Sequence, residues 1–240
     1  ESGYLLFEVS TLEGEKVARF TRKDMSGIER FTWNGKYSST AEISSRNEPN
    51  TNPSTTTFVL PGTYVISVYR STNGVLNELI KGHSFEVNYL YNYENIDMEF
   101  NLEVDRAYAK SNAVMSKFNE LGNELTELRA GLRNTPGTSI ADLTSARAIE
   151  VTLNQLGLLL NGNPSLTKRE VESAPSLGDV IGLLTWGAWN HRGAPTGTMN
   201  NLLEDARLMI SDAQTQLDKI IESVDALEEK AKAQGVPYWD

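Results

Sequence analysis

The spacing of apolar residues changes once along the chain, near Asp97, and this change restricts the possible folds more than any other feature. Before Asp97, short runs alternate apolar and polar side chains between turn residues, which is typical of half-buried strands. After Asp97, apolar residues recur at the spacing of one face of an α-helix. We therefore expect an α+β fold with two domains, a β-domain over residues 1–94 and an α-helical domain over residues 95–240.

The strand-like runs of the first half are short and closely spaced. They comprise residues 4–11, 16–21, 28–33, 63–70 and 83–93, and hairpin turns are expected at residues 12–15 and 71–74. Roughly six or seven short strands in about 90 residues predict an antiparallel β-sandwich of the immunoglobulin or fibronectin III type. Residues 44–57 contain no apolar side chain and are expected to form a long polar loop.

Two turn motifs in this half each lie next to a large aromatic residue. Trp33 is followed by Asn34-Gly35, and Tyr64 is preceded by Pro61-Gly62-Thr63. Asn-Gly readily adopts the positive φ that a tight turn requires. We expect the Trp33 ring to be buried between the sheets of the sandwich, with Tyr64 in the core beside it.

The second half predicts long amphipathic helices separated by clear stop signals. The expected helices run from about residue 97 to 133, from 139 to 160 and from 196 to 231, with short helices after residues 167 and 176. Ser139 with Asp142, Thr167 with Glu170 and Ser176 with Asp179 have the spacing of N-terminal capping boxes. Because a long helix with one apolar stripe needs a partner, we expect an antiparallel bundle of three to four helices.

Charge and composition exclude several classes of function. The net charge is −10 and the pI is near 4.8, so nucleic acid and anionic lipid would be repelled. The absence of Cys excludes disulfides, a thiol nucleophile and thiolate metal sites. The apolar run 180–189 is too short to span a bilayer. The first residues read as the start of a strand, so we expect the chain to be a piece of a longer protein.

Residue types that carry catalysis are scarce and scattered. His83 and His191 have no second His or carboxylate at ligand spacing, so we expect no metal site. Glu222, Asp225, Glu228 and Glu229 are expected on the solvated face of the last helix rather than in a cleft. The sequence therefore predicts no catalytic centre, no metal and no cofactor.

Two groups of aromatic residues are candidates for binding. Tyr89, Tyr91 and Tyr93 share one strand parity and could stack on sugar rings, or else pack at the junction of the domains. Trp186 and Trp189 are spaced to lie on one face of a helix and could anchor a protein partner, or else cover the end of the bundle.

The order of the motifs resembles a known family. The runs FEVSTLEGEKVARF, GIERFTWNGKY, VLPGTYVISV and HSFEV resemble the small sandwich of secreted bacterial sortilin-type proteins with an Asp-box propeller. Residues 176–227 resemble the helical tail of that family, so the resemblance covers nearly the whole chain. Asn34 and Lys36 stand where Asp and Arg are usual. The Trp and Pro-Gly-Thr-Tyr motifs also resemble the immunoglobulin-like module of the flagellar hook-capping protein.

This resemblance implies a function that does not involve catalysis by this chain. The propeller of the family is glycosyl-hydrolase-like, but its Asp-box repeats are absent from this chain, so no catalytic residue is carried over. We expect a non-catalytic accessory region of a secreted, periplasmic or cell-surface bacterial protein, acting in structural support or in docking to the parent propeller or another surface protein. The alternatives are a carbohydrate-binding module and part of a glycoside hydrolase whose active site lies in the propeller.

Overall fold

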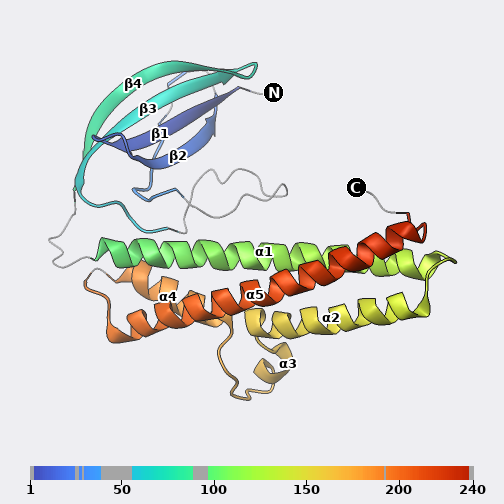
Figure 1. Ribbon diagram of the computed structural model, residues 1–240. Coiled ribbons are helices and arrows are strands. Elements are labelled where there is room, and N and C mark those ends of the chain that lie inside the picture. The colour runs from blue at the N-terminus through green and yellow to red at the C-terminus, as the bar shows by residue number, and fades with distance from the viewer. Residues whose placement is uncertain are drawn as a thin grey trace. The chain divides into compact units, whose positions relative to one another are not determined.

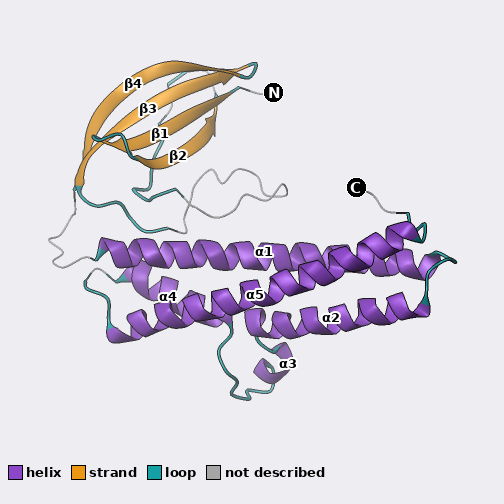
Figure 2. Cartoon of the chain, in the orientation of Figure 1, coloured by secondary structure: helices purple, strands orange, loops and turns teal. Residues whose placement is uncertain are grey.

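The computed structural model describes residues 3–24, 27–28, 30–38, 56–88, 97–191 and 193–237. The fold is α+β, because a four-stranded antiparallel sheet in the first part of the chain is followed by five helices (Figures 1 and 2). The change of apolar spacing near Asp97 therefore marks the change from strand to helix, as the sequence predicted.

The sheet has the strand order β2-β1-β3-β4. Its strands are β1 (Tyr4–Thr11), β2 (Lys16–Lys23), β3 (Gly62–Thr72) and β4 (Val75–Val87). Both predicted hairpin turns are present. In the second, Asn73 and Gly74 have φ of 52° and 76°, and a turn with two successive positive φ values matches the right-handed twist of paired strands.

One face of the sheet carries the core. Phe7 on β1 lies opposite Phe20 on β2 and opposite Val68 on β3, so these three buried side chains point to the same side. The buried residues of this core are Leu5, Phe7, Val9, Val17, Ala18, Phe20, Val59, Tyr64 and Val68. On the other side of β1, the Glu8 carboxylate pairs with Lys16 and Arg19. Their hydrogen bonds, with that of Arg19 foremost, lower the pKa of Glu8.

The strand expected at residues 28–33 is not formed, and that prediction is wrong. Residues 30–34 are irregular. The end of the segment joins the fold through an isolated bridge between Lys36 and Phe58 and through a backbone hydrogen bond from Ser38 to Val17 of β2. Phe31 and Trp33 nevertheless pack against the sheet core, while Thr32 between them is exposed. The alternation of apolar and polar residues thus correctly predicted which side chains pack against the core. It did not predict the backbone conformation, because residues 30–34 are not paired with a neighbouring strand.

Trp33 and Tyr64 meet as predicted. Their ring centroids are 6.1 Å apart in an edge-on arrangement, and Phe85 on β4 lies 6.0 Å from Trp33. Gly35 has φ of 72°, which allows the chain to reverse and lets the Trp33 indole N–H donate to the Lys36 carbonyl oxygen at 3.1 Å. The Trp33 ring is half-buried rather than enclosed.

The helices follow the predicted stop and start signals. They are α1 (Met98–Asn134), α2 (Ile140–Asn161), α3 (Pro164–Thr167), α4 (Leu177–Asn190) and α5 (Gly197–Ala233). The Ser139 and Ser176 hydroxyls accept from the backbone N–H of Asp142 and Asp179 respectively, so both capping boxes are confirmed. Thr167 instead ends α3, and the helix expected after it is absent from residues 168–176. None of the described helices is long and apolar enough to cross a membrane.

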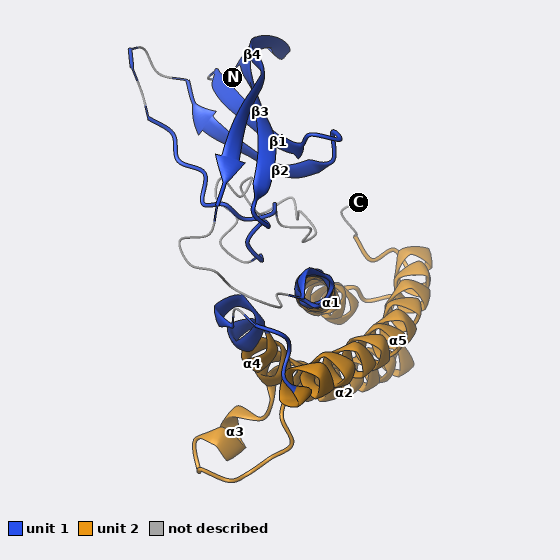
Figure 3. Ribbon diagram, turned by 90° about the vertical axis from the view of Figure 1, so that its left-hand side faces the viewer, with its two compact units in different colours: residues 1–106, 185–196 blue, residues 107–184, 197–240 orange. Residues whose placement is uncertain are grey.

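The chain divides into two compact units, each assembled from separated stretches of sequence (Figure 3). Unit 1 comprises residues 1–106 and 185–196, and unit 2 comprises residues 107–184 and 197–240. The boundary expected between residues 94 and 95 lies in a stretch outside the described residues. Within unit 2, α2 packs against α5, and the Gln234 side-chain amide after α5 donates to the Asp142 carboxylate at 2.8 Å.

Candidate functional site

The carboxylate of Asp105, on the first turns of α1, is a buried charged group of unit 1. Only 8% of the residue is exposed. Its Oδ2 atom accepts a hydrogen bond from the backbone N–H of Thr57 at 2.8 Å, and its Oδ1 atom accepts one from the indole N–H of Trp189 at 2.8 Å. Both carboxylate oxygens are therefore engaged, which suits a fixed structural contact better than a free general base.

The cation of Lys36 completes this cluster. Its Nζ atom lies 4.8 Å from the centre of the Phe58 ring and 5.7 Å from the centre of the Trp189 ring. These distances fall within the range of cation–π attraction. Burial raises the pKa of Asp105, whereas the hydrogen bonds from Thr57 and Trp189 and the charge of Lys36 act in the opposite direction. We call Lys36, Thr57, Phe58, Asp105 and Trp189 the Asp105 cluster.

The Asp105 cluster brings together four segments of the chain. It joins the start of α1, the end of α4, the segment that leads into β3 and the segment of residues 30–38. Neutral backbone and indole donors to a charged acceptor make strong, short hydrogen bonds in a site with little water. This arrangement fixes the end of α4, residues 185–190, within unit 1.

The two Trp residues predicted to anchor a partner have different surroundings. Trp189 is half-buried and hydrogen-bonded within the Asp105 cluster, whereas Trp186 is 72% exposed. The side-chain amide of Asn190 donates to the backbone carbonyl of Trp186 at 2.7 Å and so covers backbone, not the ring. The structure therefore presents one indole of the pair to solvent and uses the other to fix the helix.

The remaining residues that the sequence suggested for a site, two His and three Tyr, are not part of the Asp105 cluster. His83 is exposed on β4, and His191 is exposed after α4, with its Nε2 atom 3.0 Å from the Ala194 carbonyl oxygen. Tyr89, Tyr91 and Tyr93 lie outside the described residues, so sugar stacking by these rings stays a prediction. Across the ranges that the structure describes, no group of three or more His, Cys, Asp or Glu side chains is placed to hold a metal ion.

A second polar cluster lies in unit 2, between α1 and α5. The carboxyl groups of Glu124 and Glu228 lie close enough to interact. Burial raises the pKa of Glu124, as do the charge and hydrogen bond of Glu228 and the charge of Asp225, while Lys117 lowers it. Glu228 is only 8% exposed, so its expected place on a solvated face is wrong.

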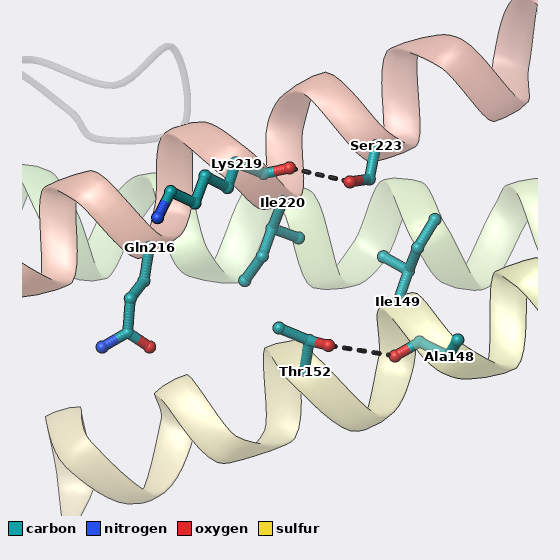
Figure 4. Close-up of a pocket in the computed structure, with 7 residues that line it drawn as sticks. All are labelled: Ala148, Ile149, Thr152, Gln216, Lys219, Ile220 and Ser223. Carbon is teal, nitrogen blue, oxygen red and sulfur yellow. Dashed lines mark hydrogen bonds between the residues drawn. The ribbon is translucent and has the colours of Figure 1, made fainter.

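A shallow pocket opens on unit 2 between α2 and α5 (Figure 4). Its volume is about 300 Å³, and its lining residues are Ala148, Ile149, Thr152, Gln216, Lys219, Ile220 and Ser223. The hydroxyls of Thr152 and Ser223 both donate to backbone carbonyl oxygens of their own helices, as the dashed lines in Figure 4 mark. These two hydroxyls are thus directed into their own helices rather than toward a ligand.

The sequence pattern could have indicated that Glu228 and Glu124 are not on a solvated helix face. Glu228 follows Val224 by four positions and precedes Ala231 by three, so it falls within the apolar stripe of α5. Glu124 stands in the same relation to the stripe of α1, three positions after Leu121. Asp105 gave a weaker signal, because its donors come from distant segments that no local pattern connects.

Comparison of the chain with protein-family models, with curated proteins and with solved structures finds no match.

Proposed function

We propose that this chain is a non-catalytic accessory region of a larger secreted, periplasmic or cell-surface protein, and that it acts by docking a protein partner. The observation that carries the proposal is the exposed indole of Trp186 on a helix that is held in place one turn later. Trp189 is fixed by Asp105 and Lys36, while Trp186 is 72% exposed. A Trp on a helix that is already held in place leaves less backbone to be ordered on binding, and exposed Trp residues are common at interface hot spots.

The partner that we propose is the propeller domain implied by the family resemblance, encoded in the same gene. The docking face would centre on Trp186, with the apolar ring buried at the interface and its N–H available to an acceptor on the partner. The isolated chain would bind no metal and would hydrolyse neither glycosides nor peptides.

Substitution of Trp186 tests the docking function. Trp186→Ala should weaken binding to the separately produced propeller domain by about 2 kcal/mol, a loss of about 30-fold in affinity. Isothermal titration calorimetry measures this effect, and circular dichroism should show unchanged helix content because the ring makes few contacts within the chain. Trp189→Ala should instead lower the melting temperature, because it leaves the Oδ1 atom of Asp105 without the donor that Trp189 supplies.

Leu208→Ala is the matched control, since Leu208 is 65% exposed on α5. It should leave both affinity and melting temperature unchanged. Equal affinities for the wild type and Trp186→Ala would place the docking face elsewhere, and an absence of binding to the propeller would contradict the proposed partner.

We also propose a finer architecture for each half. The irregular segment of residues 30–38 would serve as the second layer of a β-sandwich, supported by the packing of Phe31, Trp33 and Tyr37 against the sheet core. Helices α1, α2 and α5 would form an antiparallel bundle. Support comes from the packing of α2 on α5 and from the ion pair between Arg129 on α1 and Glu150 on α2.

A further inference from the structure

Strand β4 exposes a cluster of large apolar side chains at the edge of the sheet. Val75 is 59% exposed, Leu76 and Leu79 are each 49% exposed, and Ile80 is 46% exposed. These residues fall within the first half of the strand, directly after the turn at Asn73-Gly74. Exposed apolar residues grouped on an edge strand are unusual in monomeric proteins and mark sites of association.

The edge is irregular, and this limits the kind of association it supports. β4 pairs with β3 on one side, and the register between them shifts near Val68, so that Leu79, Lys81 and Gly82 have no residue opposite them. Gly82 has φ of 62°, as expected at a bulge. Bulges of this kind prevent a continuous backbone ladder with another strand, so contact must occur mainly through side chains.

The charges on β4 are arranged symmetrically about its apolar centre. Glu78 precedes Leu79-Ile80 and Lys81 follows them, and all four residues are exposed. If two copies of β4 run antiparallel with the two-fold axis between Leu79 and Ile80, each Glu78 lies opposite the Lys81 of the other copy. The same register places Leu79 of one copy against Ile80 of the other. The strand is therefore complementary to itself in charge and in apolar character.

We propose that β4 is a self-association surface through which two copies of this chain pair antiparallel, with Leu79 and Ile80 at the centre and one Glu78–Lys81 ion pair on each side. The contact uses the same surface of both copies, so it closes at a dimer and does not propagate. A single strand offers a small interface, so the dimer should be weak, with a dissociation constant on the order of 10–100 μM. This inference is independent of docking through Trp186.

Charge reversal on the full-length chain tests the proposal. Analytical ultracentrifugation across a concentration series should show a monomer–dimer equilibrium for the wild type. Lys81→Glu and Glu78→Lys should each weaken dimerisation about tenfold or more, because each places like charges opposite one another. The double variant Glu78→Lys/Lys81→Glu exchanges the two charges, restores the opposite pairs and should recover the wild-type dissociation constant to within about threefold.

Lys23→Glu, on the opposite edge strand β2, is the matched control, because it changes the net charge as Lys81→Glu does. It should leave the dissociation constant unchanged. A wild type that stays monomeric up to about 300 μM, well above the expected range of dissociation constants, would overturn the proposal. Equal effects of Lys23→Glu and Lys81→Glu, or a double variant that fails to recover while its circular dichroism is native, would also overturn it.

Discussion

At the scale of single residues, the main finding is that carboxyl groups occupy positions that apolar residues would be expected to fill. Glu228 and Asp105 are each 8% exposed, yet each is hydrogen-bonded. Buried carboxyl groups of this kind destabilise a fold when they lose their partners. Both residues therefore make stability sensitive to changes that leave the apolar core intact.

Glu124→Gln should make the protein more stable at neutral pH than the wild type. The pKa of Glu124 is raised in the folded state, so its contribution to stability is complete below its unfolded value and is lost as pH rises through the folded pKa. Gln can keep the hydrogen bond to Glu228 without a charge. The melting temperature should thus be unchanged near pH 4 and higher by about 1–2 °C near pH 8, a small gain because solvent screens Glu124.

Glu127→Gln is the control for this pH series, since Glu127 is exposed on the same helix. Differential scanning calorimetry of the three proteins from pH 4 to pH 8 provides the measurement. A constant difference between wild type and Glu124→Gln at all pH values would show that the pKa of Glu124 is not raised in the folded protein.

At the scale of elements, local signals in the sequence predicted the boundaries well where the cause is local. The turn at Asn73-Gly74 and the caps at Ser139 and Ser176 depend on residues within a few positions of each other, and all were predicted. The strand expected at residues 28–33 was wrong because a strand also needs a partner for its backbone, and alternation contains no information about that partner.

Ser176→Ala should destabilise the protein by about 1 kcal/mol. Ser176 is 3% exposed, its hydroxyl donates to the Asp179 carboxylate at 2.6 Å, and its backbone N–H donates to the same carboxylate at 2.9 Å. Alanine removes the hydroxyl that accepts a hydrogen bond from the backbone N–H of Asp179 in the first turn of α4. Urea denaturation measures the change. Ser145→Ala, in the exposed interior of α2, should change stability by less than about 0.5 kcal/mol, and equal losses in both variants would show that the cap contributes nothing specific.

At the scale of the whole molecule, the two compact units do not follow the order of the sequence. Residues 185–196 belong to unit 1, although the change of apolar spacing suggests that everything after Asp97 is one helical body. Composition and periodicity describe which elements form but not which distant segments pack together. The Asp105 cluster could not be predicted for the same reason, because Thr57, Asp105 and Trp189 become neighbours only in the folded chain.

A fragment of residues 1–94 should therefore be less stable than the same region of the full chain. It lacks Asp105 and Trp189 and leaves the buried backbone N–H of Thr57 without its acceptor, at a cost of about 1–3 kcal/mol. Denaturation followed by the fluorescence of Trp33 reports on the fragment, and Asp105→Ala in the full chain should give a loss of similar size. A fragment as stable as the full chain would show that the β-domain is complete within residues 1–94.

The hydrogen bond between Asp105 and Trp189 also has a consequence during synthesis. The two residues are separated by 84 positions, so at 5–20 residues per second Asp105 is translated roughly 4–17 s before Trp189. A sheet forms in far less time than this, so the Oδ1 atom of Asp105 has only water to bond until Trp189 is made, while the Thr57 N–H is already available to Oδ2. The burial of Asp105 is a late step of maturation, and a nascent chain that stalls before α4 is complete would carry a finished sheet with an open, hydrated Asp105.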